Sequence, residues 1–446
     1  MNAQKETVPG ITAAAAQNAL SQLTVLRPLL TQAPFCALQA LLGAIAREDG
    51  QGCTEAYHAL TGALLDSDAR RVTGDIWRDY LMHSLLLTPN RFSRLAAQGV
   101  RDEALCVAMR YDLWHLGTLC ALSSAVIKDW LAKPAQRPDP HTPQDNISRL
   151  SSAAWTGSVP VGGGAAPAPA PMKAPSLPAQ NWLGWRYGMP ESLPDHYLAD
   201  EALEEIYHRL QTVSDWGTLL DDIWNFHAGY GTGAFLRHRL FAVTAAGLSP
   251  LRDEDLPEEE KVVLYRTQQE TLLRTVIRFM RQEPAQDLLL CGGDGTGRTT
   301  QVLCVARELP EVRLILLDMT QLDRAMELLP TLAAQPLRFL LFVDDADLTH
   351  PAWRRFTAAV RTAKLQGGTF LLLAAAKEGR DSMLPLRVQF AEPDMKTFIR
   401  LVDDLAKEAG LSPAFSDIEN ACIDCKAAGE PLNYHTAYAI VDQLQA

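Results

Sequence analysis

The sequence lacks any apolar run long enough to cross a membrane. Its longest stretch of this kind, TFLLLAAA at residues 369–376, falls far short of the about 18 residues that a membrane-spanning helix needs. The N-terminal segment MNAQKETVPG has no basic region followed by an apolar one, so no secretory signal is apparent. We therefore expect a cytoplasmic protein with no membrane partner.

The sequence also lacks the cysteine pattern of a disulfide-stabilised protein. Its eight cysteines are scattered over 446 residues, and Cys422 and Cys425 are the one pair at C-x-x-C spacing. A zinc site of this type needs a second pair, which is missing. Because positions i and i+3 of a helix share a face, we interpret both thiols as structural rather than as a redox or metal site.

The sequence has fewer basic than acidic residues only after residue 150. Residues 1–150 contain 14 basic and 14 acidic side chains, whereas residues 151–446 contain 27 basic and 39 acidic ones, which gives the net charge of −12. An acidic C-terminal part is unsuited to sequence-independent binding of nucleic acid, so we expect no nucleic-acid partner. A local basic groove is still compatible with this balance.

Two kinds of composition are present in the first part of the chain. Residues 11–133 have the apolar spacing of helices throughout, and we interpret Trp77, Trp114 and Trp130 as core residues. Residues 150–180 are instead dominated by Gly, Ala, Pro and Ser, with an alternating Ala-Pro segment. This composition favours extended backbone with no core to bury, so we predict a semi-rigid linker.

From residue 252 onward, short apolar runs alternate with helical patterns. The runs are DLLL at 287–290, VRLILLDM at 312–319, LRFLLFVDDADL at 337–348 and GTFLLLAAA at 368–376. Near-continuous apolar strands that are separated by helices predict a parallel sheet covered by helices on both faces.

The segment GGDGTGRTT follows the first of these strands and leads into a helical pattern. Gly292, Gly297 and Thr299 have the spacing of a phosphate-binding (Walker A) loop. Glycines allow backbone N–H groups to turn towards an anion, and the following helix points its positive end at the same place. We therefore predict a nucleotide site made of Gly292, Gly293, Asp294, Gly295, Thr296, Gly297, Arg298, Thr299 and Thr300.

Two aspartates end the apolar strand FLLFV, about 50 residues after the loop. A carboxylate in this place of a P-loop protein holds Mg²⁺ together with the loop hydroxyl. We predict that Asp344 and Thr299 are the Mg²⁺ residues. Asp345 is placed to orient the attacking water and is our candidate catalytic residue.

Four segments resemble one AAA+-related P-loop family, which is known as domain of unknown function 815. In order, they are DLLLCGGDGTGRTT, LDMTQL, LRFLLFVDDADL and FAEPDMKTFIRLVDDLAKEAGL, and the helical YRTQQETLLRTVIRF before them is similar too. The resemblance covers roughly residues 225–446. It implies an α/β P-loop NTPase core of three layers with a parallel sheet, a small helical lid, and ATP and Mg²⁺ as ligands.

The chain is too long for one ordinary core, so we expect several domains. The N-terminal helices, which the linker would tether, are the expected binding module for a protein partner. We predict five segments: an all-helical N-terminal domain (1–149), the linker (150–180), a lead-in segment of helices and a strand (181–250), the P-loop nucleotide-binding core (251–390) and the helical lid (391–446).

Four positions depart from the family pattern together. Arg298 replaces the loop lysine, and Lys377 stands where a polar residue, often Asn, follows the fourth strand. The segment that should hold an Asp-Arg pair is short and leaves Arg380 and Arg387 as candidate arginine fingers. The turn near the C-terminus, PLNYHTA at 431–437, contains no arginine.

These departures bear on hydrolysis more than on binding. A guanidinium is broad and planar and cannot replace the compact lysine ammonium between phosphates, whereas the backbone of the loop is unchanged. Phosphoryl transfer depends on positioning and charge stabilisation, so we expect an ATP-binding scaffold or switch with weak or absent hydrolysis. Two alternatives stay open: an active ATPase that remodels a protein partner, and a structural interaction protein that binds no nucleotide.

Overall fold

The computed structural model describes residues 11–132, 182–188, 200–252, 256 and 264–445. The linker predicted at 150–180 lies outside them. Contacts between Cα atoms divide the chain into two compact units, and the ranges of the two units alternate along the sequence. The N-terminal unit takes Met1–Leu85, Val107–Leu193 and Arg209–Leu220, and the C-terminal unit takes Leu86–Cys106, Pro194–His208 and Asp221–Ala446.

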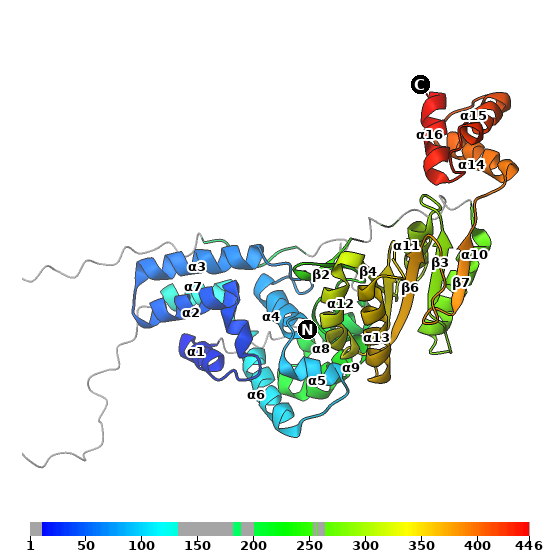
Figure 1. The fold of residues 1–446 in the computed structure, drawn as a ribbon. Helices are drawn as coiled ribbons and strands as arrows, with labels where there is room; N and C mark the ends of the chain where they lie inside the picture. Colours follow the sequence, from blue (N-terminus) through cyan, green and yellow to red (C-terminus); the bar gives the residue numbers. More distant parts are fainter. Residues whose placement is uncertain (1–10, 133–181, 189–199, 253–255, 257–263, 446) are drawn as a thin grey trace, which may run out of the picture. The chain divides into compact units, whose positions relative to one another are not determined.

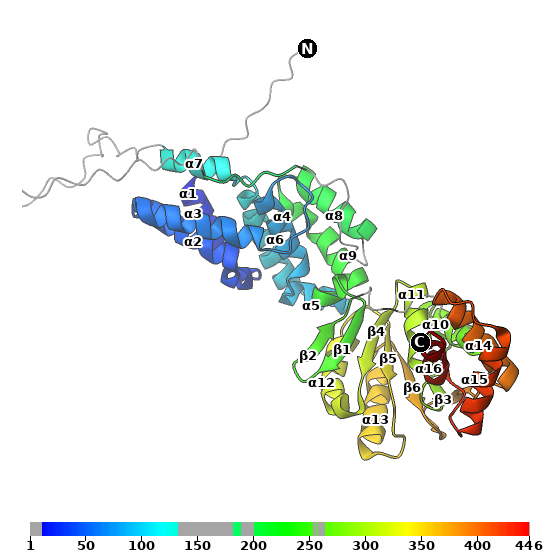
Figure 2. The same ribbon diagram turned by 90° about the horizontal axis from the view of Figure 1, so that it is seen from above.

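Helices form the first part of the chain, as its periodicity predicts (Figures 1 and 2). Thr12 and Asp49 cap two of them by accepting hydrogen bonds from the backbone N–H groups of Ala15 and Gly52. The helices are α1 (Ala13–Ser21), η1 (Arg27–Thr31), α2 (Ala33–Ala46), α3 (Gly50–Leu65), α4 (Ile76–Leu87), α5 (Arg91–Ala97), α6 (Glu103–Leu119) and α7 (Ser124–Ala132).

The three tryptophans expected in the core have different surroundings. Trp77 is fully buried, and its Nε1 donates to the Leu119 carbonyl at 2.9 Å. Trp130 is half-buried. The interpretation of Trp114 is wrong, because its side chain is 52% exposed on α6, where Val107 and Tyr111 are exposed too. Helical periodicity does not distinguish a core face from an exposed apolar face of the same spacing.

A short segment after the predicted linker completes the core of the N-terminal unit. The Trp185 ring is fully buried and stacks on Tyr57 with 5.7 Å between ring centroids. Its Nε1 donates to Thr61 Oγ1 at 3.0 Å, and its carbonyl accepts from the backbone N–H of Ile76 at 3.0 Å. This part of the predicted lead-in segment thus packs as a structural element of the N-terminal unit.

The C-terminal unit is built on a seven-stranded sheet of order β2-β1-β4-β5-β6-β3-β7. Every neighbouring pair is parallel except the β1–β2 hairpin. The α/β P-loop architecture predicted from the alternating pattern is confirmed. The strands are β1 (Leu240–Thr244), β2 (Gly247–Pro250), β3 (Leu288–Gly292), β4 (Arg313–Leu317), β5 (Phe339–Val343), β6 (Phe370–Ala376) and β7 (Leu386–Phe390).

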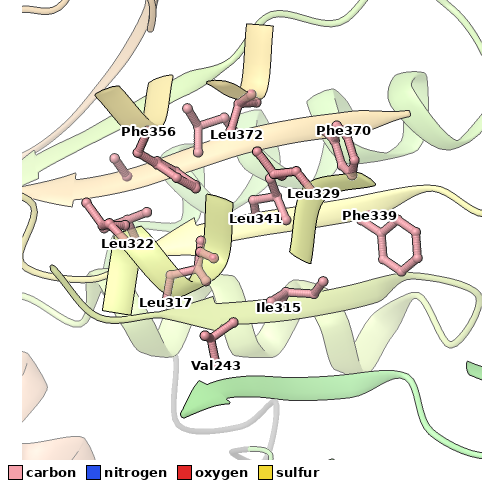
Figure 3. Packing of buried hydrophobic residues seen from close by; sticks show 14 of the residues in the cluster. Val243, Ile315, Leu317, Leu322, Leu329, Phe339, Leu341, Phe356, Phe370 and Leu372 are labelled. Atoms are coloured by element: carbon pink, nitrogen blue, oxygen red, sulfur yellow. The ribbon is translucent and has the colours of Figure 1, made fainter. Parts of the chain in front are cut away.

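Helices cover both faces of this sheet (Figure 2). On one face, α12 (Leu322–Ala333) and α13 (Pro351–Leu365) pack on apolar strand residues. Figure 3 shows this layer, in which Phe356 and Leu322 meet Leu372 and Leu317. On the other face, α10 (Arg266–Met280) and α11 (Arg298–Glu308) pack on the alternate strand residues. The central strands β3, β5 and β6 are therefore buried on both sides.

The last part of the chain is a helical lid with a core of its own. It consists of α14 (Met395–Glu408), α15 (Phe415–Ala427) and α16 (Tyr434–Gln445), as predicted. The remaining helices are α8 (Asp200–Thr212), η3 (Trp216–Leu219), α9 (Leu220–Tyr230), η4 (Gly233–Leu236) and η7 (Met319–Gln321). Within the described ranges, no helix is both long and apolar enough to span a membrane.

Candidate functional site: a glycine-rich loop at the end of β3

The loop between β3 and α11 has the backbone of an anion cradle. Gly295 and Gly297 have positive φ angles of 73° and 80°, which favour glycine, and Gly297 is the N-cap of α11. Thr296 Oγ1 donates to the Gly293 carbonyl at 2.8 Å and fixes the turn. The helix therefore begins directly after the loop, with its free N–H groups and positive dipole end at the loop.

The hydroxyl of Thr299 and the carboxylate of Asp344, our predicted Mg²⁺ residues, lie together. Thr299 Oγ1 donates to Asp344 Oδ2 at 2.7 Å, across from the first turn of α11 to the end of β5. Parallel strands bring their carboxyl ends to one edge of the sheet, which explains why residues far apart in sequence meet here. Two oxygens at one point suit Mg²⁺, which binds few protein ligands and keeps several waters.

Asp345, the candidate catalytic residue, has a left-handed backbone with a φ of 45°. Its backbone N–H donates to Asp344 Oδ1 at 3.0 Å. Its side chain is directed to Arg298, whose Nη2 lies 3.4 Å from Asp345 Oδ1. The carboxylate is thus paired with a cation of the loop in this structure.

Arg298 is buried inside the site although it carries a charge. The side chain is 6% exposed, and Nη2 also lies 3.7 Å from Asp294 Oδ1. Nη1 is buried and has no hydrogen-bond partner among the described residues. A buried polar group without a partner is costly, so the site is short of one acceptor. An anion in the loop would supply that acceptor.

Lys377 is paired with the loop through Asp294. Its Nζ lies 2.5 Å from Asp294 Oδ2. The hydrogen bond from Lys377, helped by the charges of Lys377 and Arg298, holds the pKa of Asp294 below its usual range. Asp294 therefore stays ionised between two cations, and Lys377 is bound to the loop itself.

The lid contacts the loop directly, which the sequence did not predict. Asn433 Nδ2 donates to the Asp294 carbonyl at 2.9 Å, and the Tyr434 N–H donates to the Gly295 carbonyl at 3.0 Å. A methyl group at Gly297 would lie 3.2 Å from the Tyr434 ring. These residues occupy the turn in which the family resemblance implied arginines. An Asn before an apolar helix signals a helix N-terminus, but nothing local signals its contact with a distant loop.

The first glycines of the loop border a pocket of about 480 Å³. A methyl group at Gly293 would meet no atom within 4 Å, whereas one at Gly292 would lie 2.8 Å from the Phe390 carbonyl oxygen. Arg380 and Arg387, the candidate fingers, both line this pocket. Arg387 Nη2 donates to Gln389 Oε1 at 2.7 Å. The last predicted loop residue, Thr300, lies half-buried in the first turn of α11.

The chemistry of the donors fits a polyphosphate with a divalent cation. The unpartnered nitrogen of Arg298, the glycine backbone and the Thr299–Asp344 oxygens converge at the end of β3. Among the described residues, no group of three or more His, Cys, Asp or Glu could hold a metal by itself. Cys422 and Cys425 are buried in the lid, where burial raises the pKa of Cys422 to about 11.

The parallel sheet and the glycine-rich loop together define an α/β protein of the P-loop type. Residues 234–355 match the family model described as Protein of unknown function (DUF815), so the resemblance predicted from the sequence is confirmed there. A search of curated proteins finds no significant match.

Solved structures resemble part of the chain at low identity. The Thermotoga maritima RuvB Holliday junction branch migration motor matches with 15% identity and a TM-score of 0.33, over 42% of this chain and 64% of its own. The Aeropyrum pernix Orc1 protein in complex with DNA matches with 15% identity and a TM-score of 0.35, over 41% of this chain and 60% of its own. This chain thus spans less than two thirds of either, and at these TM-scores neither match carries an argument about function.

Proposed function

We propose that the C-terminal unit binds ATP with Mg²⁺ and works as a nucleotide-gated scaffold or switch with weak or absent hydrolysis. The observation that carries this proposal is the buried Arg298 guanidinium, which has an unpartnered nitrogen inside a glycine-rich loop. The phosphates of a nucleotide would accept from Nη1 and from the N–H groups of the loop. Mg²⁺ at Thr299 and Asp344 would neutralise phosphate charge.

Two contacts support weak hydrolysis. Asp345, our candidate to orient water, is paired with Arg298 at 3.4 Å. Lys377, which stands where a residue that senses the last phosphate is expected, is bound to Asp294. Hydrolysis needs groups that are already placed around the transition state, because they act by position and charge. Here the available charged groups are paired with one another.

The contact between lid and loop supports a gate. Asn433 and Tyr434 donate to carbonyl groups of the same loop that would turn its N–H groups towards phosphate. A nucleotide in the loop would therefore lie next to the hydrogen bonds that join lid and loop. If the nucleotide binds more tightly with the lid in one position than in another, that difference in affinity sets how far the lid equilibrium shifts.

A protein partner on the N-terminal unit is the second part of the proposal. Val107, Tyr111 and Trp114 form an exposed apolar stripe at helical spacing on α6. Tyr and Trp are enriched at protein interfaces, and exposed apolar patches on soluble proteins often mark such sites. We propose this stripe as the partner surface and expect no nucleic acid there.

Thermal unfolding with and without Mg-ATP tests the site. ATP at about 100 times its Kd would stabilise the unit by about 2.7 kcal/mol, which raises the melting temperature by roughly 5–10 °C. Thr299→Ala removes a magnesium oxygen and should abolish the shift. Thr271→Ala is the matched control, because that hydroxyl bonds only to its own helix, at the Thr267 carbonyl.

Phosphate release then separates the three functions. A melting shift without turnover supports the switch. A shift with turnover that Thr299→Ala abolishes supports an active ATPase instead. No shift at millimolar ATP, in wild type or in the Thr271→Ala control, would leave a structural interaction protein.

A further inference from the structure

The connection from β6 to β7 differs from the other parallel crossovers of the sheet. The connections after β3, β4 and β5 each contain a helix, α11, α12 and α13, whereas residues 377–385 contain none. Parallel crossovers usually contain a helix, which covers the sheet. Here the place beside α13 that such a helix would take holds only a loop.

The sequence of β7 agrees with an uncovered face. Leu289 and Cys291 of β3 pair in register with Arg387 and Gln389 of β7, so these four side chains share one face. The two β3 residues are buried, but the two β7 residues are exposed and polar. The polar character of β7 is what a strand needs where no helix of its own chain packs on it.

A preformed groove lies between α13 and this loop. Its volume is about 670 Å³, which is within the range of ligand sites. The loop is held to α13 by Trp353 Nε1, which donates to Asp381 Oδ2 at 2.6 Å. Asp381 Oδ1 accepts from the Met383 N–H at 2.8 Å, so both carboxylate oxygens are used within the wall of the groove.

The groove is basic although the chain as a whole is acidic. Arg354, Arg361 and Arg380 line it, and no carboxylate of the described residues forms an ion pair with any of them. Arg355, the neighbour of Arg354, instead pairs with Asp323 at 2.9 Å, outside the groove. Apolar side chains alternate with these arginines along the groove, namely Leu348, Ala358, Leu365 and Met383.

We propose that this groove binds an acidic amphipathic helix of a protein partner, in the place of the missing crossover helix. Arg354 and Arg361 are seven residues apart on α13, which is about 10.5 Å along the axis. Carboxylates two turns apart on the partner helix match that spacing, and apolar residues between them meet Ala358 and Leu365. Arginine pairs with carboxylates in a bidentate way, which gives the helix its register.

The composition of the groove favours a helix over nucleic acid. A phosphate backbone needs positive charge along its path, but here apolar side chains separate the arginines. The net charge of −12 also opposes a polyanion of high charge density. Helix-in-groove recognition uses this mixture of apolar anchors and flanking charge. The proposal does not depend on nucleotide binding.

A labelled peptide of about 18 residues, helical in water, tests the proposal with the full chain and without nucleotide. It places Glu at seven-residue intervals and Leu on the same face between them; a scrambled peptide of equal composition has no such face. We expect saturable binding with a Kd below about 100 µM for the first peptide only. Arg354→Glu and Arg361→Glu should each weaken binding at least tenfold.

Arg355→Glu is the matched control, since it places the same charge one residue away but outside the groove, and binding should stay within about twofold. Thermal unfolding checks that each variant is folded. If a charge-reversal variant is not folded, Arg361→Gln is tested in its place. Equal binding of the scrambled peptide, no saturation at about 1 mM, or equal loss in Arg355→Glu overturns the proposal. The proposal is also overturned if a single-stranded DNA of about 20 nucleotides binds more tightly than the peptide and depends on the same arginines. It is overturned as well if the chain forms a dimer that Arg361→Glu dissociates.

Discussion

Arg298 is the residue at which sequence and structure give the most information about function. A lysine there would present one compact ammonium, whereas the guanidinium reaches two carboxylates at once, Asp294 and Asp345. Asp345, which we expected to orient water, is thereby paired with Arg298, which we expected to bind phosphate. This arrangement is consistent with an anion site whose charges are already partly compensated.

The substitution Arg298→Lys should tighten nucleotide binding and restore little hydrolysis. The ammonium fits between phosphates and loses the pairing with Asp345, so a gain in affinity on the order of tenfold, or about 1.4 kcal/mol, is expected. Lys377 stays bound to Asp294 and no arginine enters the lid turn. Titration with Mg-ATP and steady-state phosphate release measure the two effects separately.

Wild-type turnover decides whether this interpretation holds. Asp345→Asn keeps the shape of the side chain and removes its charge, so it reports on water activation without emptying the loop. Wild-type phosphate release on the order of 1 s⁻¹, an ordinary enzymatic rate, that disappears in Asp345→Asn would show an active ATPase. In that case Arg298 would be a working substitute for lysine.

Local motifs at the residue scale were predictable, and long-range contacts were not. The loop from Gly292 to Thr300 and the Thr299–Asp344 pair follow from spacing, because a strand, a glycine turn and a helix fix one another. The bond from Asn433 to the Asp294 carbonyl joins residues 139 positions apart. No sequence period reports a contact of that kind, since it depends on how the lid packs.

At the scale of elements, the lid contact depends on one side chain with two tasks. Asn433 Oδ1 accepts from the Thr436 N–H at 2.9 Å and so caps α16, while Nδ2 donates to the loop. The two tasks use different atoms of one amide. A substitution that keeps the oxygen and removes the donor therefore tests the contact without loss of the cap.

Asn433→Asp should release the lid from the loop by about 1 kcal/mol, because a hydrogen bond is lost and a carboxylate faces a carbonyl. We expect amide hydrogen exchange in α14, α15 and α16 to become roughly fivefold faster, since 1 kcal/mol corresponds to about that factor. Exchange in α10 and α11 should not change. Asn433→Ala, which also removes the cap, is the comparison: equal effects of both variants, or faster exchange across the whole unit, would contradict a specific lid contact.

The elements that were easy to predict are those buried on both faces. β4, β5 and β6 read as continuous apolar runs because helices cover both sides of them. β7 was not predicted, because it alternates buried and exposed residues over only Leu386–Phe390 and follows a proline. The same alternation is what shows that one face of β7 has no helix of its own chain on it.

At the scale of the whole molecule, the two compact units exchange segments of chain. Leu86–Cys106, from the first part of the sequence, belongs to the C-terminal unit. Arg209–Leu220 and the segment around Trp185, from the second part, belong to the N-terminal unit. Composition locates the linker-like region at 150–180 but gives no information about which unit the flanking segments join.

A cut in the middle of the chain should therefore leave both fragments associated. A recognition site for a specific protease, inserted between about 160 and 170, allows complete cleavage under native conditions. After the cut, the nicked protein should elute in gel filtration at the mass of the intact 49.0 kDa chain. The reason is that each fragment completes the core of a unit that begins in the other.

Among the side chains of the N-terminal unit, we expect Trp185 to contribute most to the association of the two fragments. It is fully buried, stacks on Tyr57 and donates to Thr61, so Trp185→Ala should cost about 3–5 kcal/mol and weaken the nicked complex. Trp114→Ala removes an equal side chain from an exposed position and should leave elution of the nicked protein unchanged. Separation of the wild-type fragments without denaturant would mean that each folds on its own side of the cut. The domains would then be consecutive along the chain, as composition alone suggests.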